Sequence, residues 1–155
     1  MIAKVRGRFL VFSGAVEIGV VPEDSCVQVS IDASSIDTGD VQRDAHLRSA
    51  DFFDVERYPT LSYRSTAVRP GEDDAWVLDG ELTIRGVSRP VVLDVEFGGA
   101  ASDPWGKLRT AFTATGEVDR DEWGLNWNQA LEAGGFLVGK QVKLNLEVEA
   151  VLRSD

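Results

Sequence analysis

Apolar and polar residues alternate one by one over long stretches of this chain, and this period of two restricts the fold more than any other feature. Residues 142–152 show it clearly, with Val142, Leu144 and Leu146 separated by Lys143 and Asn145. The pattern recurs over 10–18, 27–31, 61–65, 76–84, 91–97 and 108–118. Because successive side chains of a β-strand point to opposite faces, each stretch predicts a strand with one dry and one wet face.

Short segments rich in Gly, Pro and Asp separate these strands, at 21–24, 70–74, 86–90, 98–99 and 103–106. Such short connections predict antiparallel neighbours, since parallel strands need a crossover of a dozen or more residues. Residues 40–53 have apolar positions near helical spacing and predict a short helix, whereas 121–135 predict a long loop or a short helix. The sequence therefore predicts an all-β antiparallel barrel with one or two short helices, because closure removes exposed strand edges.

Size and charge exclude several classes of protein. The 155 residues fit one domain spanning 1–155, and the net charge of −10 argues against a nucleic-acid partner or adsorption to anionic membranes. A single Cys and a single His leave no zinc-type ligand set, and we expect no metal or cofactor. No apolar run approaches the roughly 18–20 residues of a membrane helix, so we expect no stable membrane insertion.

The sequence pattern allows two interpretations of the interior of such a barrel. A barrel of about eight strands either fills with side chains or holds one small ligand. The inward candidates are long aliphatics and Phe, with Gly14, Ser65, Ala114 and Gly116 among them. These small residues either leave room for a ligand or accommodate bulky neighbours, and alternation alone does not separate the two.

Several motifs, taken in order, resemble one known family. They are Ile31-Asp32-Ala33-Ser34-Ser35-Ile36-Asp37-Thr38-Gly39, Arg43-Asp44-Ala45-His46-Leu47-Arg48-Ser49, Asp51-Phe52-Phe53-Asp54-Val55, Tyr58-Pro59-Thr60, Leu82-Thr83-Ile84-Arg85-Gly86-Val87-Ser88-Arg89-Pro90-Val91, Asp103-Pro104-Trp105-Gly106, Arg120-Asp121-Glu122-Trp123-Gly124-Leu125 and Val138-Gly139. Over nearly the whole chain they resemble the YceI-like family of bacterial polyisoprenoid-binding proteins.

The resemblance implies an extended lipocalin-like barrel of about eight antiparallel strands around an elongated hydrophobic tunnel. It also implies a non-enzymatic protein, often dimeric, for which transport, storage and stress response have been proposed. Family members usually carry a further strand before Val5, so we expect the first strand to be absent from this chain. The edge left by a missing strand would invite a homodimer.

The tunnel hypothesis assigns a set of ligand-binding residues. They are Phe12, Val16, Val29, Ile31, Phe52, Phe53, Leu61, Tyr63, Leu82, Ile84, Leu93, Phe112, Trp123, Trp127 and Leu144. We expect Arg43, Asp44 and His46 to tie the predicted helix to the barrel or to contact a polar head group. We expect no catalytic residues, because residues two apart on a helix do not face each other and no oxyanion hole is marked.

The sequence thus predicts non-enzymatic binding of a long apolar lipid, with the protein as carrier or reservoir. The alternatives are a carbohydrate- or protein-binding β module with a filled core, and a hydrolase centred on Asp44 and His46. The first residues hold too few apolar side chains for a secretory signal. We therefore expect a cytoplasmic protein as the chain is written, and a periplasmic or secreted one if a further segment precedes it.

Overall fold

The computed structural model describes residues 4–129 and 138–153, which are mostly β-structure. The strands are β1 (Arg8–Phe9), β2 (Phe12–Glu17), β3 (Cys26–Asp32), β4 (Ile36–Asp37), β5 (Thr60–Pro70), β6 (Trp76–Ile84), β7 (Val87–Ser102), β8 (Leu108–Asp119) and β9 (Gln141–Val151). Helix α1 spans Val41–Arg48, and short 3-10 helices span Pro22–Asp24 (η1), Ala33–Ser35 (η2) and Arg120–Trp123 (η3).

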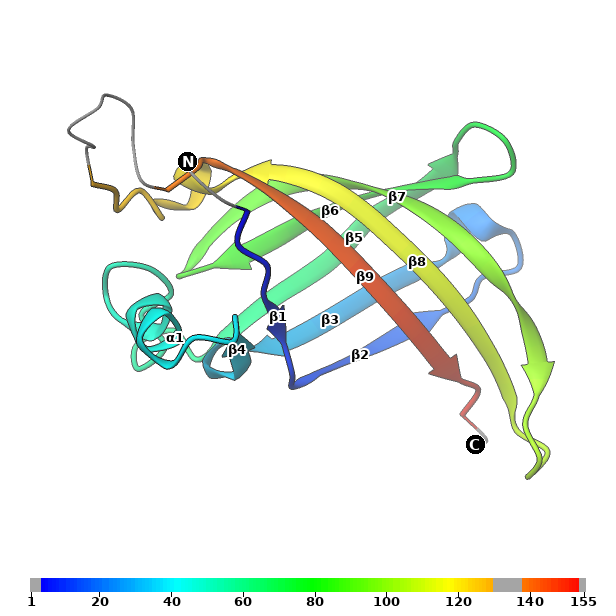
Figure 1. The fold of residues 1–155 in the computed structure, drawn as a ribbon. Coiled ribbons are helices and arrows are strands. Elements are labelled where there is room, and N and C mark those ends of the chain that lie inside the picture. The colour runs from blue at the N-terminus through cyan, green and yellow to red at the C-terminus, as the bar shows by residue number, and fades with distance from the viewer. Residues whose placement is uncertain (1–3, 130–137, 154–155) are drawn as a thin grey trace.

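One antiparallel sheet of seven strands carries the architecture, in the order β2-β3-β5-β6-β7-β8-β9 (Figure 1). Every neighbouring pair in this sheet is antiparallel, as the short connections predict. The remaining two strands, β1 and β4, form a separate small sheet. The strand predicted from about Arg8 to Ile18 is therefore two strands, because Arg8–Phe9 pairs with β4 and only Phe12–Glu17 joins the large sheet.

The large sheet curls into a half-barrel and does not close on itself. Among residues 4–129 and 138–153, no ladder joins β2 to β9, which are the two edges of the sheet. The antiparallel, lipocalin-like architecture is confirmed, whereas the hydrogen-bonded closure predicted from edge protection is wrong for the described residues. Closure would need another ladder between these edges.

The turn between β6 and β7 is tighter than the Gly-Pro segment predicts. Ile84 pairs with Val87, and the two residues between them, Arg85 and Gly86, have φ values of 52° and 72°. This two-residue turn suits the right-handed twist of a hairpin. Pro90 does not break the strand, since it pairs with Glu81 at a position before the ladder with β8 begins.

Two other predicted turns or helices differ from the structure. Residues 98–99 form a bulge inside the long β7–β8 ladder, where the register shifts between Phe97 and Ala100, and not a turn. Helix α1 begins after Asp40, whose carboxylate accepts hydrogen bonds from the Gln42 and Arg43 amides, and ends at Arg48, earlier than predicted. The predicted loop over 121–135 begins with η3, and its part after residue 129 lies outside the described residues.

The core lies against the inner face of the sheet, below η3 and the segment after α1. It consists of Ala33, Leu61, Tyr63, Leu78, Leu82, Ile84, Val91, Leu93, Ala114, Val118, Trp123 and Leu125. The Trp123 indole is 1% exposed, and its N–H donates to the Leu82 carbonyl oxygen at 2.8 Å. A buried indole with its single donor satisfied fixes η3 to the end of β6.

Candidate functional site

The strand residues predicted to face a ligand share one face of the large sheet. Register shows this directly, since residues paired across strands lie on the same face. Phe12 pairs with Ile31, which pairs with Leu61, and Val29 pairs with Tyr63, which pairs with Leu82. The strand residues placed on this inner face are Phe12, Val16, Val29, Ile31, Leu61, Tyr63, Leu82, Ile84, Leu93, Phe112 and Leu144.

The middle of this inner face is filled by protein. The ring of Tyr63 lies directly over Gly80, and its hydroxyl donates toward the carbonyl oxygens of Leu78 and Val91 at 3.4 and 3.3 Å. At Gly116, a Cβ would lie 2.7 Å from the Leu93 Cδ2. Of the two readings for the small residues, accommodation of a bulky neighbour therefore holds at Gly116.

Burial also changes the chemistry of Tyr63. The side chain is 5% exposed, and this burial, together with the charge of Asp79, raises the pKa of Tyr63 to about 12. A phenol in this position stays neutral at physiological pH, so Tyr63 acts as a hydrogen-bond donor to the sheet backbone. It contributes packing, not acid–base chemistry.

Away from the middle, the same face is apolar and incompletely covered. Val95, Ala114 and Leu146 form one row across β7, β8 and β9, and Phe97, Phe112 and Val148 form the next row outward. Phe97 is 55% exposed, and Phe112, Leu146 and Val148 are half-buried. We call the set Val95, Phe97, Phe112, Leu146 and Val148 the apolar trough.

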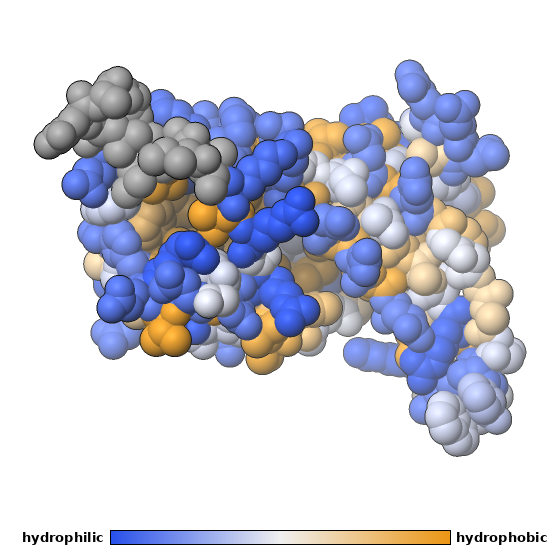
Figure 2. All heavy atoms as spheres, viewed as in Figure 1, coloured by the Kyte–Doolittle hydropathy of each residue, from blue (hydrophilic) through white to orange (hydrophobic). Residues whose placement is uncertain are grey.

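Two aromatic rings of the apolar trough pack against each other. The Phe97 and Phe112 ring centroids lie 5.6 Å apart with the rings tilted by 50°. Figure 2 shows several apolar patches on one face of the molecule, with hydrophilic side chains between them. Phe12 adds a separate apolar edge on β2, where it is 56% exposed beside a surface pocket of about 340 Å³ that includes Pro59 and Thr60. The described residues thus present an open apolar surface where a closed tunnel is expected.

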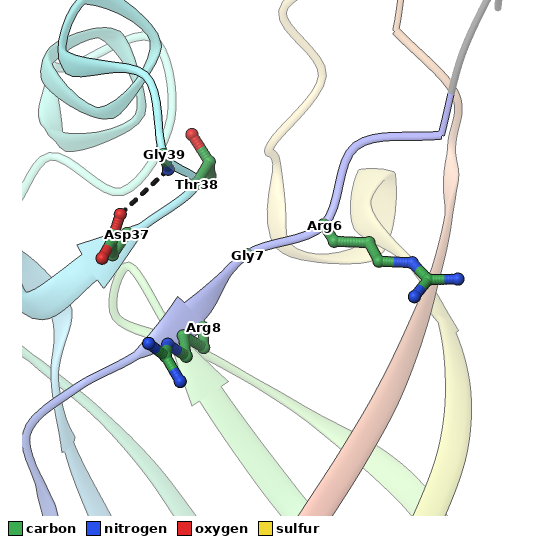
Figure 3. A pocket seen from close by; sticks show the side chains of 6 residues that line it. All are labelled: Arg6, Gly7, Arg8, Asp37, Thr38 and Gly39. Carbon is green, nitrogen blue, oxygen red and sulfur yellow. Dashed lines mark hydrogen bonds between the residues drawn. The ribbon is translucent and has the colours of Figure 1, made fainter.

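A second pocket lies at the junction of β1 and β4. Its volume is about 330 Å³, and it is lined by Arg6, Gly7, Arg8, Asp37, Thr38 and Gly39 (Figure 3). The Arg6 and Arg8 side chains extend in different directions, and the Asp37 carboxylate accepts a hydrogen bond from the Gly39 amide at 2.9 Å. Because the two guanidinium groups do not converge, this pocket offers no obvious anion site.

The polar residues predicted near the helix divide into separate networks. The Asp44 carboxylate accepts hydrogen bonds from the amide and the hydroxyl of Thr38, and the Arg43 guanidinium donates to the Thr38 hydroxyl and carbonyl oxygens at 2.8 and 2.9 Å. The Thr38 hydroxyl, with smaller contributions from its amide and from Arg48 and Arg43, holds the pKa of Asp44 below its ordinary value. These contacts tie α1 to the end of β4.

His46 faces a different group of residues. Its Nε2 lies 2.8 Å from the Asp51 carboxylate, and its ring packs edge-on against Phe52 and Trp127 at 5.1 and 4.5 Å between centroids. The Ser49 hydroxyl donates to the His46 carbonyl oxygen, not to the imidazole. Asp44, His46 and Ser49 therefore do not form the hydrogen-bonded relay that a hydrolase of this kind would need.

The remaining predicted aromatic residues cover this end of the sheet. Phe52 packs against Trp127 at 5.6 Å, and Phe53 packs edge-on against Phe9, also at 5.6 Å. Phe52 is buried, Phe53 and Trp127 are half-buried, and Trp123 belongs to the core. None of them belongs to the apolar trough, and of the predicted strand residues only Phe112 does. The sequence patterns did not single out the other trough residues, which are Val95, Phe97, Leu146 and Val148.

Arg120 is the residue at this end that sequence reasoning did not single out. It is 6% exposed, and its guanidinium donates to the carbonyl oxygens of Gly139, Leu125, Trp127 and Val138 while lying 5.9 Å from the centre of the Phe52 ring. The sequence feature that could have identified Arg120 is its position at the start of the Arg-Asp-Glu-Trp-Gly motif. Its role is to hold the chain on both sides of residues 130–137.

Within the described parts of the chain, no three His, Cys, Asp or Glu side chains lie close enough together to hold a metal ion. No helix in those same parts has the length and apolar character needed to cross a membrane.

The fold and the inner face together define a class of protein. A curled antiparallel sheet whose apolar inner face is capped at one end by a short helix and an aromatic cluster is a lipocalin-like half-barrel. The family model for the YceI-like domain matches residues 1–150, and the chain belongs to the YceI-like family. The family resemblance read from the sequence motifs is thereby confirmed.

Known relatives agree with this assignment. The chain is 36% identical over 152 residues to the UPF0312 protein SAB2563 of Staphylococcus aureus, covering 96% of this chain and 85% of that protein. It superimposes on the crystal structure of the Campylobacter jejuni YCEI protein with a TM-score of 0.86 at 28% identity, over 99% of this chain and 88% of the other. Burkholderia cenocepacia BcnA shares the fold, with a TM-score of 0.83 at 21% identity over 97% and 90% of the two chains.

Proposed function

We propose that the protein binds a long apolar lipid, such as a polyisoprenoid, along the apolar trough and serves as its carrier or reservoir without catalysing a reaction. The observation that carries the proposal is the exposure of Phe97, at 55%, in a row with Phe112 and Val148 on the inner face of the sheet. An exposed aromatic side chain beside half-buried apolar neighbours supports a binding site on this face. A bound chain would cover it.

The energetics favour a long ligand over a short one. Burial contributes about 0.8 kcal/mol per methylene. Association costs on the order of 4–15 kcal/mol, because the ligand and the protein lose translational and rotational freedom. Roughly five to twenty buried methylenes are therefore needed only to offset this cost, and further ones to make binding tight. Outside the filled middle, the inner face of β8 runs from Leu108 to Ala114. At roughly 3.3 Å per residue, an extended chain could lie along about 20 Å of it.

The filled middle of the sheet decides where the chain would lie. Leu82 is 7% exposed, and its carbonyl oxygen accepts a hydrogen bond from the Trp123 indole N–H. Replacing Leu82 by a charged residue would therefore test folding and not ligand binding. Phe97 and Phe112 lie outside this filled region and are the residues to change. The proposed ligand contacts are those of the trough, with Leu144 at its inner boundary.

The test compares two exposed apolar residues of β7 on opposite faces. Phe97 is 55% exposed on the inner face, and Val92 is 51% exposed on the outer face, where it pairs with Asp79. Full burial of a Phe side chain contributes about 1.5–3 kcal/mol, and roughly half of that is available at Phe97. We expect Phe97→Ser to weaken binding of solanesol, a linear polyprenol, by about 5–10-fold, and Val92→Ser to change it less than about twofold.

Both side chains are about half exposed, so both variants should stay folded, which circular dichroism checks. Phe97→Ser should lose about 1 kcal/mol of stability, because part of its ring is already packed against Phe112. Equal binding by the two folded variants would contradict the assignment to the trough. Sugar or protein binding that Phe97→Ser leaves unchanged, in a protein that takes up no solanesol, would instead favour a binding module with a filled core.

A further inference from the structure

The β7–β8 hairpin, accompanied by β9 as far as the Arg109–Val151 pair, extends past β6 at one end of the sheet. The ladder between β6 and β7 ends where Trp76 pairs with Val95, whereas β7 continues to pair with β8 as far as Ser102 and Leu108. At roughly 3.3 Å per residue, this extension is about 20 Å long. Figure 1 shows it projecting at the end of the molecule opposite to α1.

The turn at the end of this hairpin is held by one carboxylate. The Asp103 carboxylate accepts hydrogen bonds from the Trp105 and Lys107 amides, both at 2.9 Å, and from the Arg109 guanidinium at 2.9 Å. The Lys107 amide first and the Arg109 guanidinium second hold the pKa of Asp103 below its ordinary value. Gly106, at φ 82°, takes the left-handed position of the turn. The turn is therefore well defined.

This ordered turn presents a large aromatic side chain to solvent. Trp105 is 81% exposed. Leu108, three residues along the chain, is 45% exposed, and Leu152, whose amide donates to the Leu108 carbonyl oxygen at 2.9 Å, is 65% exposed. We call Trp105, Leu108 and Leu152 the hairpin tip. An amphipathic indole held at the end of a rigid projection suits the boundary between water and hydrocarbon.

The hairpin tip continues into the apolar trough. From Leu108 the inner face of β8 runs through Thr110 to Phe112, and the matching residues of β9 are Ala150 and Val148. Asp103 and Glu149 both pair with Arg109, and Lys107 is exposed next to Trp105, so the tip is not acidic although the chain carries a net charge of −10. One face of β8 and β9, apolar except for Thr110, therefore joins the end of the hairpin to the trough.

We propose that the hairpin tip docks the protein on the surface of a lipid bilayer, with Trp105 at the level of the head groups. The proposal rests on the proposed function, because a water-insoluble ligand has to be collected from or delivered to a membrane. Docking through the tip places the open end of the trough at that surface. The net charge of −10 makes a zwitterionic bilayer the favoured surface, since anionic lipid repels the rest of the protein.

Flotation with phosphatidylcholine vesicles tests this inference. We expect the wild type to bind, and Trp105→Ser to lower the partition coefficient by about tenfold, equal to about 1.4 kcal/mol. The matched control is the double change Trp105→Ser and Val41→Trp. Val41 is 86% exposed on α1, at the other end of the molecule, so this variant keeps the number of Trp residues while moving one away from the hairpin tip. We expect it to bind as weakly as Trp105→Ser. Adding phosphatidylserine should weaken wild-type binding.

The outcomes separate docking from lipid binding. Wild-type protein that does not float, or Trp105→Ser that floats equally well, contradicts the docking inference. Conversion of a dimer to a monomer by Trp105→Ser, without vesicle binding, would make the tip a protein interface and also contradict it. Solanesol uptake is measured in parallel from detergent solution. Vesicle binding without uptake would reject the proposed function alone, and uptake without vesicle binding would reject docking alone.

Discussion

Gly80 is the position where the packing of the inner face is most sensitive to one added methyl group. The Tyr63 ring occupies the space that a Cβ at residue 80 would need, and that Cβ would also lie 2.7 Å from the Arg64 carbonyl oxygen. A backbone oxygen cannot move away cheaply. Gly80→Ala therefore forces the Tyr63 ring off the sheet and strains the hydroxyl contacts to Leu78 and Val91.

The expected cost follows from this overlap. Overpacking of a dense core costs about 1–3 kcal/mol, while the loss of Gly freedom in the unfolded chain returns about 0.4–1 kcal/mol. A net destabilisation of about 1–2 kcal/mol follows. In a chain of 155 residues, this corresponds to a fall in Tm of roughly 2–8 °C.

A double-mutant cycle measured by urea unfolding checks the cause. In a Tyr63→Leu background the ring is absent, so Gly80→Ala should cost at least about 1 kcal/mol less than in the wild type. Gly98→Ala is the control, because its Cβ would approach the Ala111 carbonyl oxygen only to 3.3 Å. A neutral Gly80→Ala, or one whose cost is independent of Tyr63, would refute the claim that the middle of the inner face is filled.

Two further stability predictions concern buried polar groups. Because burial raises the pKa of Tyr63 to about 12, its contribution to stability is complete below pH 10 and is lost as the pH rises toward 12. Urea unfolding between pH 9 and 12 should show this loss in the wild type and not in Tyr63→Phe. Arg120→Met removes the donor shared by four backbone carbonyl oxygens and should cost about 3 kcal/mol or more. A cost below about 1 kcal/mol in chemical denaturation would rule out the holding role of Arg120.

The period of two predicted much of the fold correctly, because side-chain direction in a strand is a local property. Alternation predicts the dry face of each strand, and the register puts the dry faces of strands as distant as β2 and β9, with Phe12 and Leu144, on one side of the sheet. The turn at 103–106 was also predictable, since Asp and Gly at those positions satisfy the turn locally.

Properties that depend on distant contacts were not predictable in this way. Whether Gly116 leaves a space or receives Leu93 depends on the packing of a neighbouring strand. The Gly and Pro of residues 86–90 predict a break between strands, but Pro90 pairs with Glu81 within the β6–β7 ladder. It is tolerated there because β8 begins to pair with β7 only at Asp94. The split between the apolar trough and the aromatic cluster around His46 arises because α1 and η3 cover only one end of the sheet, which alternation does not report.

Native mass spectrometry of the purified protein, followed by solvent extraction and identification of any lipid, tests the central claim most directly. The account predicts a mass excess that disappears on extraction, together with a long-chain isoprenoid or similar amphiphile in the extract, and reduced retention in Phe97→Ser. A clean mass for the polypeptide alone, with no uptake of added solanesol, would contradict lipid binding along the apolar trough.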